Sequence, residues 1–419
     1  MFTTIAIIIL LVLIVLEIPI GFALIIASSI GLWLSPAGLM NAPIKLLDST
    51  SNFVILALPL FILMGALITE AGIARRLIDL AQSLVGWMRG GLAHVNVVTN
   101  MFVAEISGSP TADAAMLGKI FVPEMAENGY PKEFAAAVTS AAAVIGGIIP
   151  PSISFIIYGA VTNTSVRDLF IAGIIPGILL GFLFMVVSYL YAVRKGFTST
   201  QPFSVNLLLR ATRDALIPLL IPILVVGGLI YGVFTPTEAA GVGVVIALGY
   251  GLATRLLTRQ AFYRSLVIST HQSAAIMVII AGAALFGQLL ALEQVPQHIS
   301  AFLANMGASQ IEMLLLVNIV LLFVGLFLEP ASAILIVVPL LYPIVIQYGI
   351  DPVHFGVMTV VNLAIGQQTP PTAPVLLTVC AGSNLRIGPV LTYMKYYLVA
   401  MVIALMLITF VPELSLWLV

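Results

Sequence analysis

Apolar stretches separated by short polar turns run along the whole chain, and several of them contain no charged residue. Residues 174–193, 215–233 and 313–328 approach or reach the roughly 20 residues that a helix needs to cross a bilayer. The first apolar stretch, 5–16, has no Lys or Arg before it and is followed by Glu17, not by a small-residue cleavage site. We therefore expect a retained helix and not a signal peptide. The pattern as a whole predicts an all-α polytopic membrane protein.

The apolar pattern and its interruptions occur twice, at a constant spacing of 220 residues. Proline and glycine constrain the backbone, so a constant spacing between matching Pro and Gly residues indicates a repeated architecture. The matching positions include Pro110 and Pro330, Gly146 and Gly366, and the dipeptides Pro150-Pro151 and Pro370-Pro371. Paired Gly- and Pro-broken segments in both halves of a membrane chain are typical of a transporter's binding site.

Each half of the chain is expected to contain three crossings, a proline-broken segment, a crossing broken at Pro-Pro, and a last crossing. If the proline-broken segments are re-entrant hairpins, each half has five full crossings, and this odd number inverts the second half. The expected organisation is a first inverted repeat at 1–200, a cytoplasmic amphipathic linker at 201–213 and a second repeat at 214–419. The hairpins are expected at about 91–128 and 309–349, and the broken helices at about 133–163 and 353–383.

The distribution of Lys and Arg provides an independent test of this topology, because cytoplasmic ends of membrane helices carry most of the positive charge. With the N-terminus outside, the outer ends carry only Lys45 and Arg167, and Lys119 lies within the first hairpin. The other Lys and Arg residues fall at inner ends. The charges therefore favour a periplasmic N-terminus, a first hairpin that enters from the cytoplasm and a second that enters from outside.

Composition excludes several classes of function. The chain is 61% hydrophobic and 8% charged, which no soluble domain can bury, and its net charge of −1 with no basic patch argues against nucleic acid as a partner. The single cysteine, Cys380, excludes an intramolecular disulfide, and the four histidines have no metal-ligand spacing. No nucleophile motif or phosphate-binding loop is present, so we expect neither an enzyme nor an ATPase. Energy for uphill transport would then come from an ion gradient.

Candidate chemistry lies at the hairpin tips and at the breaks. The first tip, 105–113, is rich in Ser, Thr and Gly, and the first break, 146–152, contains two glycines and two prolines. Proline leaves carbonyl groups without intrahelical donors, and such groups are costly in a bilayer unless something binds them. Hydroxyl and carbonyl oxygens suit Na⁺, and the broken helix ends would direct positive dipoles at an anionic substrate group.

Three motifs resemble those of the large membrane subunit of TRAP (tripartite ATP-independent periplasmic) transporters. They are Ile106-Ser-Gly-Ser-Pro-Thr-Ala-Asp113, Gly147-Ile-Ile-Pro-Pro-Ser152 and Gly366-Gln-Gln-Thr-Pro-Pro-Thr372. The resemblance spans essentially the whole chain and implies an elevator-type transporter in a bacterial inner membrane. It also implies two partners, a small four-helix membrane subunit and a periplasmic substrate-binding protein. Substrates of such systems are organic acids such as C4-dicarboxylates and sialic acids.

Carried over to this sequence, the resemblance implies three groups of site residues. The first sodium site would contain Ser107, Ser109, Gly146, Ile149 and Pro151. The second sodium site would contain Gly325, Leu328, Glu329, Gly366, Thr369 and Pro371. The substrate would lie near Thr111, Asp113, Gln367 and Thr372. The 220-residue offset replaces the two serines of the first tip by Phe327 and Glu329, so the ligand chemistry of the second site must differ.

The sequence therefore favours the large subunit of a sodium-coupled importer of an organic carboxylate. A stand-alone divalent-anion/sodium symporter of similar elevator architecture is the alternative, and it would need no binding protein. An intramembrane enzyme is a third class, which would require a nucleophile–base pair that the sequence does not offer. Two roles are open for Glu329. Its carboxylate either faces a cation or maintains the shape of the hairpin by accepting hydrogen bonds from backbone amides.

Overall fold

The computed structural model describes residues 2–36, 38–72, 74–198, 202–305 and 309–419, with side chains described throughout except at 105–107 and 302–305. All regular elements in these ranges are helices, which confirms the all-α fold. The first half contains α1 (Phe2–Val15), α2 (Ile20–Leu34), α3 (Ala42–Thr50), α4 (Ala57–Glu70), α5 (Ala74–Val85), α6 (Gly91–Ser107), α7 (Pro110–Glu127), α8 (Lys132–Ala143), the 3₁₀ turn η1 (Val144–Gly147), α9 (Ile153–Thr162) and α10 (Val166–Lys195). The second half contains α11 (Val205–Ile230), α12 (Pro236–Ala253), α13 (Arg259–Leu292), α14 (Val295–Asn305), α15 (Gln310–Gly325), α16 (Pro330–Gln347), α17 (Pro352–Gly366), α18 (Pro374–Gly382), α19 (Ile387–Phe410) and α20 (Glu413–Leu416).

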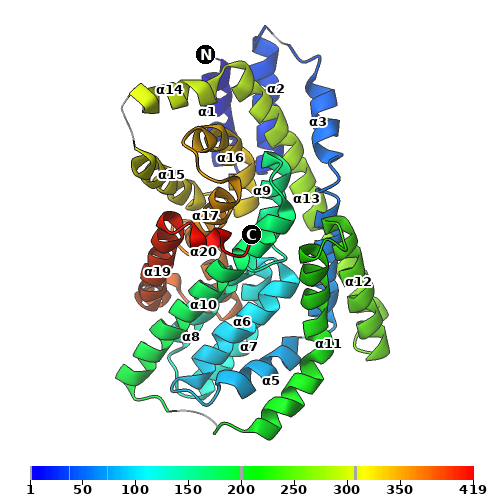
Figure 1. Ribbon diagram of the computed structural model, residues 1–419, viewed down its shortest axis with the longest axis vertical. Coiled ribbons are helices and arrows are strands. Elements are labelled where there is room, and N and C mark those ends of the chain that lie inside the picture. The colour runs from blue at the N-terminus through cyan, green and yellow to red at the C-terminus, as the bar shows by residue number, and fades with distance from the viewer. Residues whose placement is uncertain (1, 37, 73, 199–201, 306–308) are drawn as a thin grey trace.

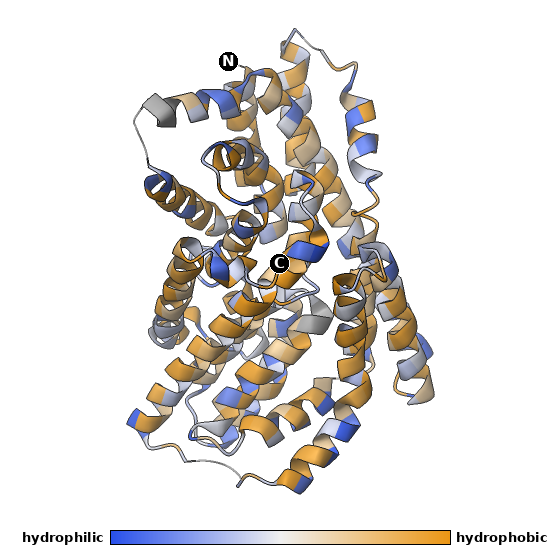
Figure 2. Ribbon diagram, viewed as in Figure 1, coloured by the Kyte–Doolittle hydropathy of each residue, from blue (hydrophilic) through white to orange (hydrophobic). Residues whose placement is uncertain are grey.

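Among the described residues, six helices are long and apolar enough to cross a membrane, namely α10, α11, α12, α13, α16 and α19. These helices are mostly apolar along their length (Figure 2), and many of their large apolar side chains are exposed, where water-facing helices would carry polar ones. Together with the all-helical fold, this confirms a polytopic membrane protein. The expected first two crossings, α1 and α2, have 14 and 15 residues and are shorter than the roughly 20 residues of a full span.

The helix boundaries repeat at the spacing of the sequence repeat. α7 and α16 begin and end 220 residues apart, and α9 and α18 follow the same offset within one residue. The counterpart of the single long helix α13 is the pair α3 and α4, which together occupy the equivalent positions. The inverted orientation of the two halves and the limits of the two repeats stay predictions. Helix α11 begins at Val205, inside the stretch that the sequence assigns to the linker.

The two hairpin turns have a local cause in the sequence. Helix α6 ends where Gly108 adopts a left-handed conformation (φ 59°), and Ser109 is extended before Pro110 starts α7. A left-handed residue is tolerated best as glycine, and proline is favoured at the first position of a helix. In the second half α15 ends at Gly325, and Pro330 again begins the returning helix, α16. In both halves, two helices joined by a short turn occupy the positions expected for the hairpins, and their re-entry into the membrane stays a prediction.

The two helix breaks are also built alike. After η1, the chain passes through the cis Pro150-Pro151 bond to Ser152, whose hydroxyl donates to the Gly147 carbonyl (2.6 Å) and caps α9. The second break runs from the end of α17 through the cis Pro370-Pro371 bond to the start of α18. The first break is buried among helices, so its irregular backbone is shielded from the apolar surroundings, whereas Pro370 and Pro371 of the second break are exposed.

Buried asparagines form hydrogen bonds between each hairpin and its broken helix. In the first half, Asn96 of α6 donates to the hydroxyl of Thr139 on α8 (2.6 Å). In the second half, Asn362 of α17 donates to the side-chain oxygen of Asn318 on α15 (2.8 Å). These residues are essentially inaccessible, so each bond satisfies groups that would otherwise be costly to bury.

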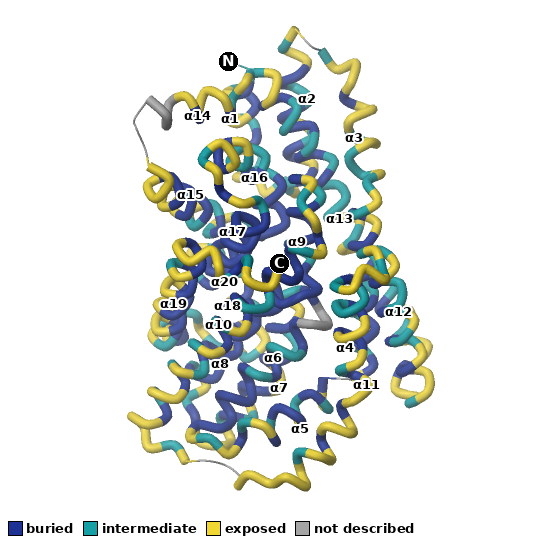
Figure 3. Tube along the Cα trace, in the orientation of Figure 1, coloured by how far each residue is buried: buried dark blue, intermediate teal, exposed yellow. Residues whose placement is uncertain are grey.

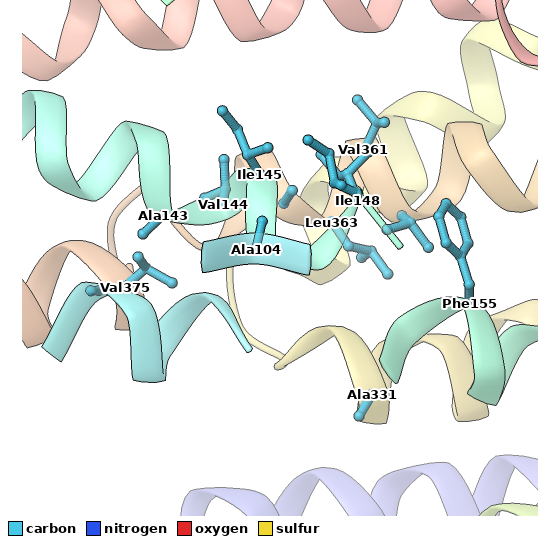
Figure 4. Close-up of a cluster of buried hydrophobic side chains, with 14 of the residues drawn as sticks. Ala104, Ala143, Val144, Ile145, Ile148, Phe155, Ala331, Val361, Leu363 and Val375 are labelled. Carbon is cyan, nitrogen blue, oxygen red and sulfur yellow. The ribbon is translucent and has the colours of Figure 1, made fainter. Parts of the chain in front are cut away.

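The helices form two packed groups. The hairpins and broken helices pack on one another and on α10 and α19, whereas α2 packs on α13, α4 on both α12 and α13, and α11 on α12. The two groups also contact each other, through α16 with α13 and through α6 with α4. Figure 1 shows α15 and α19 on the left and α11 to α13 on the right, and the buried centre in Figure 3 includes α17. Side chains from both hairpins and both breaks meet in one apolar cluster that includes Ala104, Ile148, Ala331 and Val375 (Figure 4).

The carboxylate of Glu293 connects the end of α13 to the start of α1 through hydrogen bonds. It accepts hydrogen bonds from the amides of Phe2 (2.8 Å) and Thr3 (3.0 Å). Hydrogen bonding to Thr3 and to the Phe2 amide lowers the pKa of Glu293 from its ordinary value of 4.5 to about 2. A charged carboxylate therefore connects the two halves of the chain.

Candidate functional site

A cavity of about 170 Å³, here called the hairpin-tip cavity, lies where the two hairpin tips face α4 and α13. Ser109 and Thr111 come from the first tip, Glu329 from the second, and Gln367 from the second break. The opposite wall is formed by Ile62 of α4 and by residues of α13, Gln272, Ala275, Ile276 and Ile279. The cavity thus separates the two packed groups of helices and presents hydroxyl, amide and carboxylate groups to its interior.

Three helices begin at this cavity. Pro110, Ile153 and Pro330 are the first residues of α7, α9 and α16, and all three border it. Because the N-terminus of a helix carries unpaired amides and a partial positive charge, the cavity is favourable for a negatively charged group. Among the described residues that line it, none is Lys, Arg or His, and Glu329 is the one with a formal charge. A bound anion would therefore rely on helix ends and on cations that enter with it.

The first hairpin tip and the first break converge. The backbone of Gly108 passes so close to the Pro151 carbonyl that a Cβ on Gly108 would lie 2.9 Å from that oxygen. The hydroxyl of Ser109 lies 3.2 Å from that of Thr111. The side chain of Ile149 packs against Gly177 of α10, so only its backbone is offered to a first cation site. The side chain of Ser107, the remaining residue predicted here, lies outside the described residues.

The structure places Asp113 against the first break and away from the hairpin-tip cavity. Its carboxylate lies directly over Gly146, where a Cβ would overlap an Asp113 oxygen, and the residue is 1% exposed. Asp113 is absent from the cavity lining, whereas Thr111 from the same helix turn is present. The carboxylate is therefore closer to the predicted first sodium site than to the predicted substrate position.

The second hairpin tip and the second break converge more tightly. A Cβ on Gly366 would overlap the carbonyl group of Gly325, so the two backbones are in direct contact. Thr372 donates its hydroxyl proton to the Leu326 carbonyl (2.6 Å), and Thr369 donates to the carbonyl of Ile365 (2.9 Å). Thr372 therefore binds the hairpin, although the sequence places it with the substrate residues.

The remaining residues of the predicted second sodium site lie at different depths. Glu329 immediately precedes α16, makes no capping bond with its side chain and faces the hairpin-tip cavity. Leu328 is half-buried beside it, and Pro371 is exposed. Oxygen atoms suited to a hard cation are thus present at both breaks, from hydroxyls, carbonyls and one carboxylate. In the described residues, no group of three or more His, Cys, Asp or Glu side chains is positioned to hold a metal.

A hydrogen-bonded pair that the sequence did not indicate connects the two halves. Ser140 of α8 donates to Gln368 Oε1 (2.6 Å), and Gln368 Nε2 donates to the Ser140 carbonyl (2.7 Å). Both residues are fully buried. Because Gln368 belongs to the second break and Ser140 lies on α8, six residues before the first break, the pair connects the two breaks.

Sequence reasoning also missed the wall of the hairpin-tip cavity that α13 provides. Gln272 lines this wall and is exposed to the cavity, and Ser154 borders it from α9. The available signal for Gln272 was the polar run Ser269-Thr-His-Gln-Ser273 within a mostly apolar predicted crossing. A polar residue in such a crossing faces either a neighbouring helix or water.

The comparisons with known proteins agree with these motifs. The family described as "Tripartite ATP-independent periplasmic transporter, DctM component" matches residues 7–414. The chain is 40% identical over 383 residues to the C4-dicarboxylate TRAP transporter large permease protein DctM of Pseudomonas aeruginosa, covering 91% of this chain and 90% of that protein. It is 36% identical over 400 residues to the sialic acid TRAP transporter large permease protein SiaM of Vibrio cholerae, covering 95% and 94%.

Among solved structures, the YdaH transporter of Alcanivorax borkumensis is similar with a TM-score of 0.64, at 15% identity and with coverage of 90% of this chain and 89% of that chain. This likeness concerns the fold alone. The curated relatives are transport permeases, which confirms the expectation that the chain is not an enzyme. The match over nearly the full length and the two relatives confirm the resemblance found in the sequence. The chain belongs to the DctM family, the large membrane component of TRAP transporters.

Proposed function

We propose that the protein imports an organic carboxylate together with Na⁺, as the large subunit of a binding-protein-dependent transporter in a bacterial inner membrane. The observation that carries this proposal is the composition of the hairpin-tip cavity. Three helix N-termini meet there, and no basic side chain is among the described residues that line it. An anionic substrate needs more positive charge than partial helix dipoles supply, and cations bound at the adjacent breaks would provide it.

The two breaks are suited to this coupling role. Each break lies against a hairpin tip, and tips and breaks together carry hydroxyl and carbonyl oxygens of residues that the sequence predicts as sodium ligands, among them Ser109 and Thr369. Glu329 would face the second cation from the cavity side. Sodium bound at these positions would neutralise the carboxylate of Glu329 and favour entry of the substrate anion.

We propose an elevator mechanism on the basis of the two packed groups. The hairpins and breaks would move as one body against α4 and α13, which form the opposite wall of the cavity. Names of the relatives include C4-dicarboxylate and sialic acid, so an acid of one of these classes is the proposed substrate. A separate small membrane subunit and a periplasmic binding protein are the proposed partners.

Uptake by proteoliposomes that contain the complete transporter tests this function. Radiolabelled succinate and N-acetylneuraminate are the probes, each supplied with its cognate binding protein. Uptake of one probe should require an inward Na⁺ gradient, should persist in the presence of a protonophore and should stop when the binding protein is omitted. Equal uptake with choline in place of Na⁺ would contradict the coupling, and uptake without the binding protein would favour a stand-alone symporter.

A further inference from the structure

A second and larger cavity lies next to the hairpin-tip cavity. This large cavity has a volume of about 870 Å³ and lies between α3 and α13 on one side and α9 and α16 on the other. A side cavity of about 480 Å³ adjoins it at the start of α10. The two share Asn52, Ala160 and Asn163 in their walls, so they lie side by side, and together they are called the hollow.

The large cavity is stacked on the hairpin-tip cavity along the same three helices. On α9, Ser154 borders the hairpin-tip cavity and Ile157 borders the large one. The corresponding pair on α16 is Ala331 and Leu335. On α13 the lining of the hairpin-tip cavity ends at Ile279, and Ile280 and Ala283 line the large cavity. Steps of three or four residues equal one helical turn, so a solute in the large cavity would be about one turn from the hairpin tips.

Two cationic side chains face this hollow. Lys45 of α3 lines the large cavity, and Arg167 of α10 lines the side cavity. Both are exposed, and neither makes an ion pair with another described residue. They are also the only two cations that the sequence predicts at the outer ends of the helices. Asp48 is the one acidic residue among the linings, so the hollow has an excess of positive charge.

The wall that α13 forms also contributes a polar side chain to the large cavity. Gln288 lines the large cavity, and its Oε1 atom is buried without a hydrogen-bond partner in the described part of the chain. A buried carbonyl oxygen is costly unless a donor reaches it. The hydroxyl or amide groups of a sugar acid or hydroxy acid would supply such a donor, while its carboxylate would be attracted to Lys45 and Arg167.

We propose that the large and side cavities form a staging site, which holds the organic carboxylate before it enters the hairpin-tip cavity. The chemical class of the ligand rests on the proposed function, whereas the site itself rests on the charge and the stacking of the cavities. The staging site binds weakly, because its two cations are exposed and screened. Its contribution is to raise the local concentration of the anion at the entrance to the transport site.

Thiol reactivity measures the charge of the staging site directly. Ala284 lines the large cavity, so Ala284→Cys is introduced into the complete transporter with Cys380→Ser as background. The rates of reaction with a sulfonate-bearing and a trimethylammonium-bearing methanethiosulfonate are compared in proteoliposomes. The anionic reagent should react faster than the cationic one. The ratio of the two rates should fall by about fivefold when Lys45→Gln and Arg167→Gln are combined, the size expected for two screened charges near the thiol.

Matched variants make the result specific. Lys45→Arg with Arg167→Lys keeps both charges and should keep the rate ratio. Lys119→Gln with Arg386→Gln removes two cations that do not line these cavities and should also leave the ratio unchanged. Succinate should slow modification of the Ala284→Cys thiol in the charged background and not in the Lys45→Gln/Arg167→Gln background.

The staging site is refuted if the two reagents react equally, if the double glutamine variant keeps the wild-type ratio, or if succinate protects the thiol in both backgrounds alike. Sodium-dependent uptake by the wild-type transporter in the same vesicles tests the proposed function separately. A transporter with sodium-dependent uptake and an uncharged large cavity would overturn the staging site alone. Loss of sodium dependence with an intact rate ratio would overturn the sodium coupling alone.

Discussion

Replacing Gln368 with Met removes the hydrogen-bonded link between the two breaks while keeping a side chain of similar length. The native amide accepts a proton from the Ser140 hydroxyl (2.6 Å) and donates one to the Ser140 carbonyl (2.7 Å). Both side chains are fully buried, so water cannot replace the lost partners. The Met variant therefore leaves two polar groups of α8 without their partner.

The expected loss of stability follows from these two bonds. A buried polar group that loses its partner costs about 1–3 kcal/mol, but hydrogen bonds measured within membrane proteins average about 0.6 kcal/mol. The Ser140 hydroxyl can also turn back to a carbonyl of its own helix, which recovers part of the loss. We expect Gln368→Met to reduce the free energy of unfolding by about 1–2 kcal/mol, with a lower melting temperature in detergent.

Double-mutant analysis decides whether the two residues act through one shared contact. Ser140→Ala and Gln368→Met should together cost less than the sum of the single variants, because each already breaks the Ser140–Gln368 hydroxyl bond. Ser188→Ala is the matched control, since Ser188 hydrogen-bonds Tyr397 (2.8 Å) between α10 and α19, away from both breaks. It should lower stability while leaving the sodium dependence of uptake unchanged. Strict additivity, or a Gln368→Met protein as stable as wild type, would refute the reasoning.

Three further changes test separate contacts. Gly366→Ala should abolish uptake, because the added methyl overlaps the second hairpin, whereas Gly388→Ala, with open space around it, should be tolerated in the same uptake assay. Thr372→Val should lower the free energy of unfolding by about 1 kcal/mol through loss of the bond to Leu326, measured by thermal denaturation. Glu293, with its pKa lowered from 4.5 to about 2, stabilises the fold above pH 4.5, and this contribution is lost as the pH falls towards 2. Glu293→Gln should therefore reduce the decrease in melting temperature between pH 6 and pH 3, and an unchanged decrease would contradict this role.

The architecture could be predicted from the sequence because its main determinants are local. Gly108 and Pro110 set the first hairpin turn, and Pro330 starts the returning helix of the second. The constant offset of 220 residues then allowed helix boundaries in one half to be predicted from those in the other. Helix α3 lacked such a signal, because its counterpart in the second half is the first part of the uninterrupted helix α13.

The site was less predictable because its contacts join distant parts of the chain. The offset pairs Ser140 with Val360 and Gln368 with Ile148, so the repeat gives no indication of the bond between them. That Thr111 and Asp113 lie in one turn of a helix also did not show which way each side chain points. Thr111 and Asp113 are two positions apart on α7, and a helix turns them to different faces, one towards the cavity and the other towards Gly146.

The central claim is that cations at the breaks and an anion in the hairpin-tip cavity bind interdependently, with Glu329 between them. The most direct test is the sodium activation of uptake by Glu329→Gln, with Glu127→Gln as a control carboxylate at the far end of the other hairpin. The account predicts that the half-activating Na⁺ concentration rises by about tenfold in Glu329→Gln, the change that a loss of 1.4 kcal/mol in binding produces. It should stay at the wild-type value in Glu127→Gln. A sodium activation curve of Glu329→Gln that superimposes on that of the wild type would contradict the account.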